Sequence, residues 1–392
     1  MAPWVAGIAV VLLAGGGVAL WAALRSPVEG SGDASPVATG TRTPSSSPTP
    51  SASADPWAGW TLEEQVGQVF MVGVDVTSPA QVSTDAVVDD HVGNLFLHGR
   101  TRDGAAPVRA LVDSFTARAG RAPLLVATDQ EGGRVQVLQG PGFSAIPSAL
   151  DQASTDPANL RVQAATWGAE LAAVGVDLDL APVMDLVDGD PADNPPVGAL
   201  DRAYGFTPQS VTSHAEAFSA GMRDAGVETA IKHFPGLGRV DANPDTTADV
   251  TDTVTTRDDA AVGVFRDGIE AGARYVMVST AVYERIDPDV PAAFSSTVVT
   301  DLLRGDLGFD GVVVTDDLSG AEQVADVEPG ERAVRAIEAG VDLVLVSKVP
   351  DVAHEMVEAV VERARDDDVF AAQVRASAER VLRAKGAWPP AS

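Results

Sequence analysis

The chain has 392 residues, with 27 Lys or Arg against 56 Asp or Glu, so its formal net charge at pH 7 is −29. Such an acidic chain lacks the basic face that phosphates require, so no nucleic acid is expected as a partner. Hydrophobic residues make up 45% of the chain and there is no Cys, which excludes global disorder, disulfides, Cys-ligated zinc and a thiol nucleophile.

The first 55 residues are predicted to lie outside the folded domain. Residues 3–24 form an uncharged apolar run, which as a helix would reach roughly 33 Å and cross a bilayer. A buried globular helix is the alternative interpretation. Residues 26–55 are rich in Ser, Thr, Pro and Gly, a composition typical of an extended tether.

We therefore expect a transmembrane or signal-anchor segment at residues 1–25, a disordered linker at 26–55 and a folded domain at 56–388. The composition of the linker favours a domain outside the cytoplasm, either anchored to the cell membrane or secreted. The single charge at Arg25 favours the opposite orientation, because basic residues accumulate on the cytoplasmic side of a membrane span.

Eight short apolar runs alternate with amphipathic stretches in the rest of the chain. The runs are residues 66–74, 92–98, 123–128, 178–184, 227–233, 275–282, 311–315 and 341–347. Runs without polar alternation are typical of strands buried on both faces. Helical patterns lie between or after them, at residues 107–119, 159–174, 208–225, 258–271, 331–339, 350–365 and 368–385.

This order predicts an α/β fold, a single (β/α)8 barrel of the TIM type. A doubly wound open sheet is the main alternative, but no Gly-x-Gly-x-x-Gly sequence follows the first run, as a dinucleotide-binding sheet of that kind would require.

Charged side chains follow several of the predicted strands, and in a (β/α)8 barrel these strand ends meet at one mouth. Residues 129–131 (Asp-Gln-Glu) follow the third run, Asp185 follows the fourth, Lys232 and His233 end the fifth, and residues 316–317 (Asp-Asp) end the seventh. Each carboxylate alone could cap a helix. Cations and carboxylates together favour a site that binds and cleaves a polyhydroxylated sugar, where a carboxylate can attack the anomeric carbon.

Other catalytic chemistries find no support in the sequence. There is no Gly-x-Ser-x-Gly elbow, and the five His residues show no metal-ligand spacing, so neither a serine nucleophile of that kind nor a His-ligated metal is expected. Apart from His233, the histidines are interpreted as surface or packing residues. They are His91, His98, His214 and His354.

Several motifs resemble those of family 3 glycoside hydrolases, specifically the single-barrel β-N-acetylglucosaminidase branch, which acts on cell-wall fragments. The motifs are DQEGGRVQ (129–136), DRAYG (201–205), KHFPGLG (232–238), PAAFS (291–295), LLRGDLGFDGVVVTDDL (302–318) and AGVDLVLVS (339–347). The resemblance covers roughly residues 60–385 and implies a β-linked amino-sugar glycan as substrate, with no metal or cofactor. It implies no particular oligomeric state.

The resemblance also assigns roles to individual residues. Asp316 matches the nucleophile of the family, which forms a covalent glycosyl-enzyme intermediate. Asp129, Arg202, Lys232 and His233 match residues that bind the sugar hydroxyls. Charge-assisted hydrogen bonds of this kind are stronger than neutral ones.

The loop after the fifth strand departs from the family pattern. Where the branch has a His as general acid/base, oriented by an Asp two residues earlier, this chain has Asp245 and Asn243. Leu237 stands in place of another loop His. Thr280 lies near the position of a further His, and Val137 replaces a basic residue that helps to bind substrate.

Three interpretations of this loop follow. Asp245 can act as the acid/base if burial raises its pKa; Asp241 or Asp249 can take the role; or the acid/base is absent. The sequence accordingly predicts a retaining β-N-acetylhexosaminidase, with Asp316 and Asp245 as its catalytic pair. A catalytically impaired barrel that binds cell-wall glycans is the alternative. A phosphorolytic enzyme is a third possibility, against which the negative charge of Asp245 argues by repelling phosphate.

Overall fold

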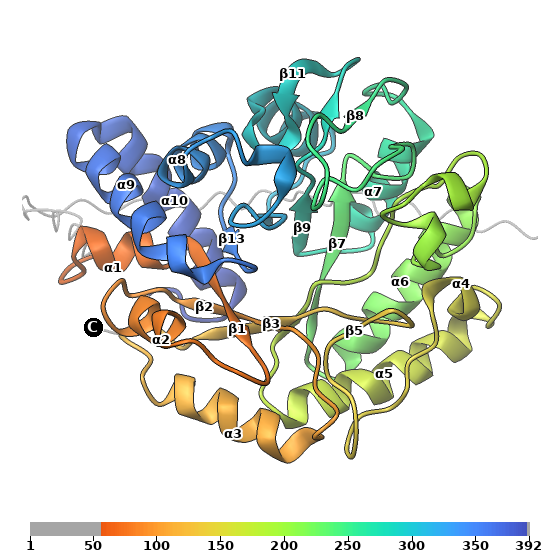
Figure 1. Ribbon diagram of the computed structural model, residues 1–392, viewed down its shortest axis with the longest axis horizontal. Coiled ribbons are helices and arrows are strands. Elements are labelled where there is room, and N and C mark those ends of the chain that lie inside the picture. Colours follow the sequence, from red (N-terminus) through yellow and green to blue (C-terminus); the bar gives the residue numbers. More distant parts are fainter. Residues whose placement is uncertain (1–55, 390–392) are drawn as a thin grey trace, which may run out of the picture. The chain divides into compact units, whose positions relative to one another are not determined.

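Eight parallel strands follow one another around the centre of the computed structural model, which describes residues 56–389 (Figure 1). They are β1 (Phe70–Asp75), β2 (Asn94–His98), β3 (Leu125–Thr128), β6 (Leu178–Asp179), β7 (Glu228–Phe234), β9 (Tyr275–Val278), β12 (Val312–Thr315) and β13 (Val344–Val346). From β1 to β12 each pairs with the next in chain order, and β13 pairs with β1. A bridge between Val314 and Leu343 closes the ring, so the predicted (β/α)8 barrel is confirmed.

Helices lie outside the strands (Figure 1). They are α1 (Leu62–Gly67), α2 (Gln81–Val88), α3 (Ala105–Thr116), α4 (Ala149–Gln152), α5 (Pro157–Ala173), α6 (Pro208–Asp224), α7 (Ala260–Glu270), α8 (Pro329–Ala339), α9 (Ala353–Asp366), α10 (Asp368–Ala384) and a π-helix, η4 (Thr297–Asp306). Side-chain caps fix several of their starts. Asp156, Thr207 and Asp259 accept hydrogen bonds from first-turn amides of α5, α6 and α7, which satisfies otherwise orphaned N–H groups.

The core forms two layers, because each strand is buried on both faces. Met71, Leu125, Leu180, Met277 and Leu345 belong to a cluster inside the barrel. A larger cluster fills the space between the strands and the surrounding helices. The near-absence of polar residues from the strand runs follows from this double burial.

Shorter elements extend the strand ends that form the mouth. β4 (Gln130–Gly132) and β5 (Val135–Gln136) form a hairpin directly after β3. β8 (Thr251–Asp252), β10 (Val282–Tyr283) and β11 (Asp287–Pro291) form a small sheet from the loops after β7 and β9. No helix within residues 56–389 is long and apolar enough to cross a membrane. The predicted anchor at 1–25 and linker at 26–55 lie outside the described residues.

A buried carboxylate joins β12, β13 and α10 at the opposite end of the barrel from the mouth. Asp342 is fully buried and accepts a hydrogen bond from the Val313 amide at 2.9 Å. It also forms ion pairs with Arg304 at 2.5 Å and Arg380 at 2.8 Å. Three donors therefore compensate the desolvation of this one carboxylate.

Replacing Asp342 by Ala should lower the free energy of unfolding by about 3–5 kcal/mol, because two guanidinium groups and one amide lose their acceptor in a buried setting. Urea denaturation followed by circular dichroism would measure the change. The exposed Asp310, replaced by Ala, provides a control that should stay within about 0.5 kcal/mol of wild type. Equal stability of the two variants would contradict the predicted role of Asp342.

Candidate active site

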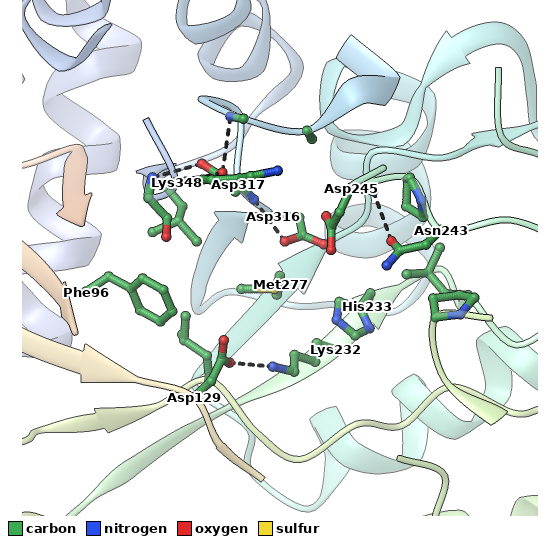
Figure 2. Close-up of a pocket in the computed structure, with 18 of the residues that line it drawn as sticks. Phe96, Asp129, Lys232, His233, Asn243, Asp245, Met277, Asp316, Asp317 and Lys348 are labelled. Carbon is green, nitrogen blue, oxygen red and sulfur yellow. Dashed lines mark hydrogen bonds and ion pairs between the residues drawn. The ribbon is translucent and has the colours of Figure 1, made fainter. Parts of the chain in front are cut away.

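The strand ends enclose a pocket of about 290 Å³ at the mouth of the barrel (Figure 2). All the site residues predicted from the sequence line it, although they come from widely separated parts of the chain. They are Asp129, Arg202, Lys232, His233, Asp245 and Asp316. Phe96, Met277 and Leu345 contribute apolar surface. A small pocket lined by charged groups on opposite sides (Figure 2) suits a ligand rich in hydroxyls.

One buried carboxylate holds two cations of the pocket, Arg202 and Lys232. Glu131 accepts two hydrogen bonds from the Arg202 guanidinium, at 2.9 and 2.7 Å, and its side chain is only 4% exposed. The Lys232 ammonium lies 2.7 Å from Glu131 and donates a second bond of 2.7 Å to Asp129. Sequence reasoning noted Glu131 after the third strand but assigned it no role.

The two cations also set the charge of Glu131. Burial by itself would raise the pKa of Glu131, but the charges of Arg202 and Lys232 outweigh that effect and lower the pKa to about 2. Glu131 therefore stays ionised across the physiological range, and its charge fixes both donors in place.

His233 is oriented by Asp185, a second carboxylate whose role the sequence left unassigned. Asp185 is fully buried and accepts from His233 Nδ1 at 2.7 Å, from the His233 amide at 3.0 Å and from the Leu237 amide at 2.8 Å. On the other side of the ring, Nε2 lies 3.4 Å from the Arg202 guanidinium, so the imidazole is held between Asp185 and Arg202.

The adjacent aspartates at the end of β12 have different environments. Asp317 accepts hydrogen bonds from the amides of Ser319, Gly320, Ser347 and Lys348 and from the Ser319 hydroxyl. Among the residues that the structure describes, Asp316 accepts a hydrogen bond only from the Asp317 amide, at 2.9 Å. Asp317 therefore has the structural role of accepting backbone hydrogen bonds, and Asp316 presents its carboxylate to the pocket.

The carboxyl groups of Asp245 and Asp316 lie next to each other among the residues that line the pocket (Figure 2). Asp245 as a whole is an exposed residue, but desolvation of its carboxyl group at the pocket, followed by the negative charge of Asp316, raises the pKa of Asp245 to about 6. Asn243 accepts a 2.9 Å hydrogen bond from the Asp245 amide, so it supports the backbone of Asp245 rather than its carboxyl group. Asp241 and Asp249 do not line the pocket, whereas Asp245 does, which favours Asp245 among the carboxylates of this loop.

A further acid lies within the barrel, on β6. Asp179 is fully buried, and burial raises its pKa to about 8, so its carboxyl group is protonated at neutral pH. One oxygen accepts from the Gln130 amide at 2.9 Å, next to the Asp129 and Glu131 positions. A carboxylate inside an otherwise apolar strand run was the sequence signal that could have identified it.

The remaining histidines take different positions. His214 is buried between the carbonyl groups of Ser210 and Thr155, and His354 pairs with Asp90 at the surface. His98 lines a second hollow next to the first, with Val137 and Lys348. Within residues 56–389, no three His, Asp or Glu side chains are grouped so as to hold a metal ion.

The sequence matches a known family over most of its length. A family model described as the glycosyl hydrolase family 3 N terminal domain matches residues 61–384. A β-hexosaminidase of Alkalilimnicola ehrlichii is 37% identical over 314 residues, which cover 76% of this chain and 85% of that protein.

Solved structures show the same likeness. The crystal structure of a β-N-acetylhexosaminidase from Beutenbergia cavernae is 60% identical, with a TM-score of 0.82, and the match covers 83% of this chain and 98% of that one. A family 3 β-N-acetylglucosaminidase from Paenibacillus is 31% identical, with a TM-score of 0.75 and coverage of 83% and 63%.

Glu131→Gln should lower the free energy of unfolding at pH 7 by about 3–5 kcal/mol, because Arg202 and Lys232 lose the charge between them. The lowered pKa of Glu131 gives this effect a pH dependence. Its stabilisation is present above the unfolded pKa near ~4.3 and is lost as pH falls toward about 2. The stability difference between wild type and variant, measured by urea denaturation from pH 7 to pH 2, should therefore narrow below about pH 4. A stability difference that widens at these low pH values would contradict the predicted ionisation of Glu131.

Proposed function

The chain belongs to glycosyl hydrolase family 3, and on that premise we propose that it is a retaining β-N-acetylhexosaminidase. Its reaction is the hydrolysis of terminal β-linked N-acetylglucosamine from cell-wall-type glycans. The observation that carries the proposal is the pair of opposed carboxyl groups at the mouth, Asp316 and Asp245, whose environments differ. Similarity to proteins named β-hexosaminidase and β-N-acetylhexosaminidase supports the choice of sugar.

The first step joins the sugar to the protein. Asp316 attacks the anomeric carbon while the protonated Asp245 gives its proton to the departing glycosidic oxygen. The raised pKa of Asp245 keeps that proton available up to about pH 6. The glycosidic bond breaks and a glycosyl ester on Asp316 forms, with the aglycone leaving as an alcohol.

The second step releases the sugar. Asp245, now a carboxylate, takes a proton from water as the water oxygen attacks the anomeric carbon. The ester bond to Asp316 breaks, Asp316 regains its negative charge, and Asp245 regains its proton. Two displacements leave the sugar in its original β configuration.

The charged groups at the floor of the pocket suit the sugar hydroxyls. Lys232 and Arg202 are donors whose positions are fixed by Glu131, Asp129 can accept, and His233 lies beside Arg202. Because these groups are oriented before substrate arrives, little reorganisation is needed on binding.

The location of the protein is also part of the proposal. We propose that residues 1–25 attach the chain to the cell membrane or direct its export, and that residues 26–55 separate the barrel from the membrane surface. The apolar run and the Ser/Thr/Pro-rich composition support this arrangement. Protease treatment of intact cells would test it, since an external barrel would be digested without lysis.

Asp316→Asn should lower kcat/KM by at least about 10³-fold on every substrate, because no carboxylate remains to form the glycosyl ester. Asp245→Asn should lower kcat/KM on chitobiose by about 10²–10⁴-fold. With 2,4-dinitrophenyl β-N-acetylglucosaminide, kcat/KM of Asp245→Asn should fall only slightly, because that leaving group departs without a proton. Initial rates with both substrates measure these effects.

Azide gives an independent check of the second step. It attacks the glycosyl ester without needing a base, so it should speed turnover of the dinitrophenyl glycoside by Asp245→Ala and yield a β-glycosyl azide. Asp241→Asn is the matched control in the same loop and should behave as wild type. If wild type binds N-acetylglucosamine but cleaves neither substrate, the chain is a glycan-binding barrel. If the reaction in phosphate buffer yields a sugar phosphate, the enzyme is a phosphorylase.

The pKa of Asp245 predicts the pH profile. Since the acid must be protonated, kcat/KM for chitobiose should fall about tenfold per pH unit above about pH 6. The dinitrophenyl substrate should show no such decline between pH 6 and pH 8. Rates with the two substrates across this range check the prediction, and a shared decline would assign the titration to another group.

A further inference from the structure

The loop that carries Asp245 is anchored at both of its ends. At the first end, Asn194 Nδ2 donates to the carbonyl groups of Leu237 at 2.8 Å and Val240 at 2.9 Å. At the second end, Val250 is buried and its carbonyl group accepts from the Val282 amide at 3.0 Å. Residues 241–249 between these anchors must place the carboxyl group of Asp245 over the pocket.

Contacts within the loop define its turn but not its position over the pocket. Besides the Asn243–Asp245 bond, the Thr246 amide donates to the Asn243 carbonyl group at 3.1 Å. These bonds fix the local backbone, as is typical of an Asn-initiated turn. They would persist if the whole turn moved away from Asp316.

The position is set from the opposite side, by η5 (Glu322–Val324). Its first two amides donate to the loop, from Glu322 to Asp245 O at 3.4 Å and from Gln323 to Pro244 O at 3.1 Å. The Gln323 side chain also forms hydrogen bonds with the backbone of Val250. Its Oε1 accepts from the Val250 amide at 2.7 Å, and its Nε2 lies 3.4 Å from the Val250 carbonyl oxygen.

We propose that Gln323 is a positioning residue that holds the Asp245 loop against the segment that carries Asp316. Across residues 56–389, it is the one side chain that hydrogen-bonds between residues 241–250 and residues 316–325. A Gln suits this task because one amide group supplies both the acceptor and the donor that a backbone unit requires. The inference rests on the proposed function, in which Asp245 is the acid.

The contact has a mechanistic consequence. η5 follows Asp316 and Asp317 on the same connecting segment, after β12, so the hydrogen bonds of Gln323 couple the two proposed catalytic carboxyl groups mechanically. Proton transfer needs heavy atoms within hydrogen-bond reach, and a displacement of roughly 1 Å can cost about 10²-fold in rate. Loss of Gln323 should therefore impair cleavage of a substrate whose leaving group needs a proton more than cleavage of a substrate whose leaving group departs without one.

The test compares Gln323→Met, which keeps the side-chain length but removes both polar atoms, with wild type. We expect kcat/KM for chitobiose to fall roughly tenfold to hundredfold, and that for the dinitrophenyl glycoside less than about threefold. Hydrogen exchange of the amides in residues 241–250 should become faster, while exchange in the barrel strands stays unchanged. Gln139→Met, which removes a half-buried Gln bonded to the Gln136 carbonyl group, is the matched control and should behave as wild type.

Gln323→Glu provides a second variant, because it keeps an acceptor for the Val250 amide. It should lie between wild type and Gln323→Met in both measurements, and it decides the question if Gln323→Met does not fold. An equal loss on both substrates, or unchanged exchange in residues 241–250, would overturn the inference. Wild type that cleaves neither substrate would instead refute the proposed function, so the two failures are distinguishable.

Discussion

Arg202 and Lys232 can lie side by side with their side chains largely buried because the buried carboxylate of Glu131 holds both of them. Without that charge, two desolvated cations would repel each other and turn toward solvent. With it, their remaining donors point in fixed directions. The rest of the site is arranged around this ion cluster: Asp129 adds a second acceptor for Lys232, and His233 Nε2 lies beside Arg202. A hydroxyl-rich ligand therefore meets donors and acceptors that are already oriented.

Environment, more than residue type, divides the work among the carboxyl groups of the mouth. The carboxylate of Asp317 accepts five hydrogen bonds, whereas the carboxylate of its neighbour Asp316 remains available to the pocket. Glu131 lies between two cations and has a lowered pKa, while Asp245 lies beside Asp316 and has a raised one. Carboxyl groups whose pKa values are pushed apart are the arrangement that a retaining glycosidase requires. A short acidic side chain can then replace an imidazole, provided that the loop places it near enough.

The sequence predicted the barrel because its strand signal is local and strong. All eight apolar runs contain a barrel strand, and the first run overestimates its strand because residues 66–67 end α1. The short helices α1, α2 and α4 and the π-helix η4 were not predicted. The short helices offer too few turns for a periodic signal, whereas η4 does bury Val298, Val299, Leu302 and Leu303 on one face, a pattern that sequence reasoning missed. At the mouth, the strand-end rule brought Asp129, Lys232, His233 and Asp316 to one pocket, and the family resemblance added Arg202 and Asp245. The rule says only where side chains meet. It could not reveal that Glu131 is a shared counter-ion or that Asp185 orients His233, because both roles depend on partners far away in the chain.

The sequence by itself therefore determined the order of strands and helices, the end of the barrel that carries charge, and the residue types present there. These follow from periodicity and from the parallel direction of the strands, which are properties of short segments. Only the tertiary structure decided which carboxyl group takes which role. It placed Asp245 rather than Asp241 or Asp249 at the pocket, and it gave Gln323 its contact with Val250 from 73 residues away. Burial, charge and hydrogen bonding between distant segments exist only after folding, and these effects set the pKa and the position of each group.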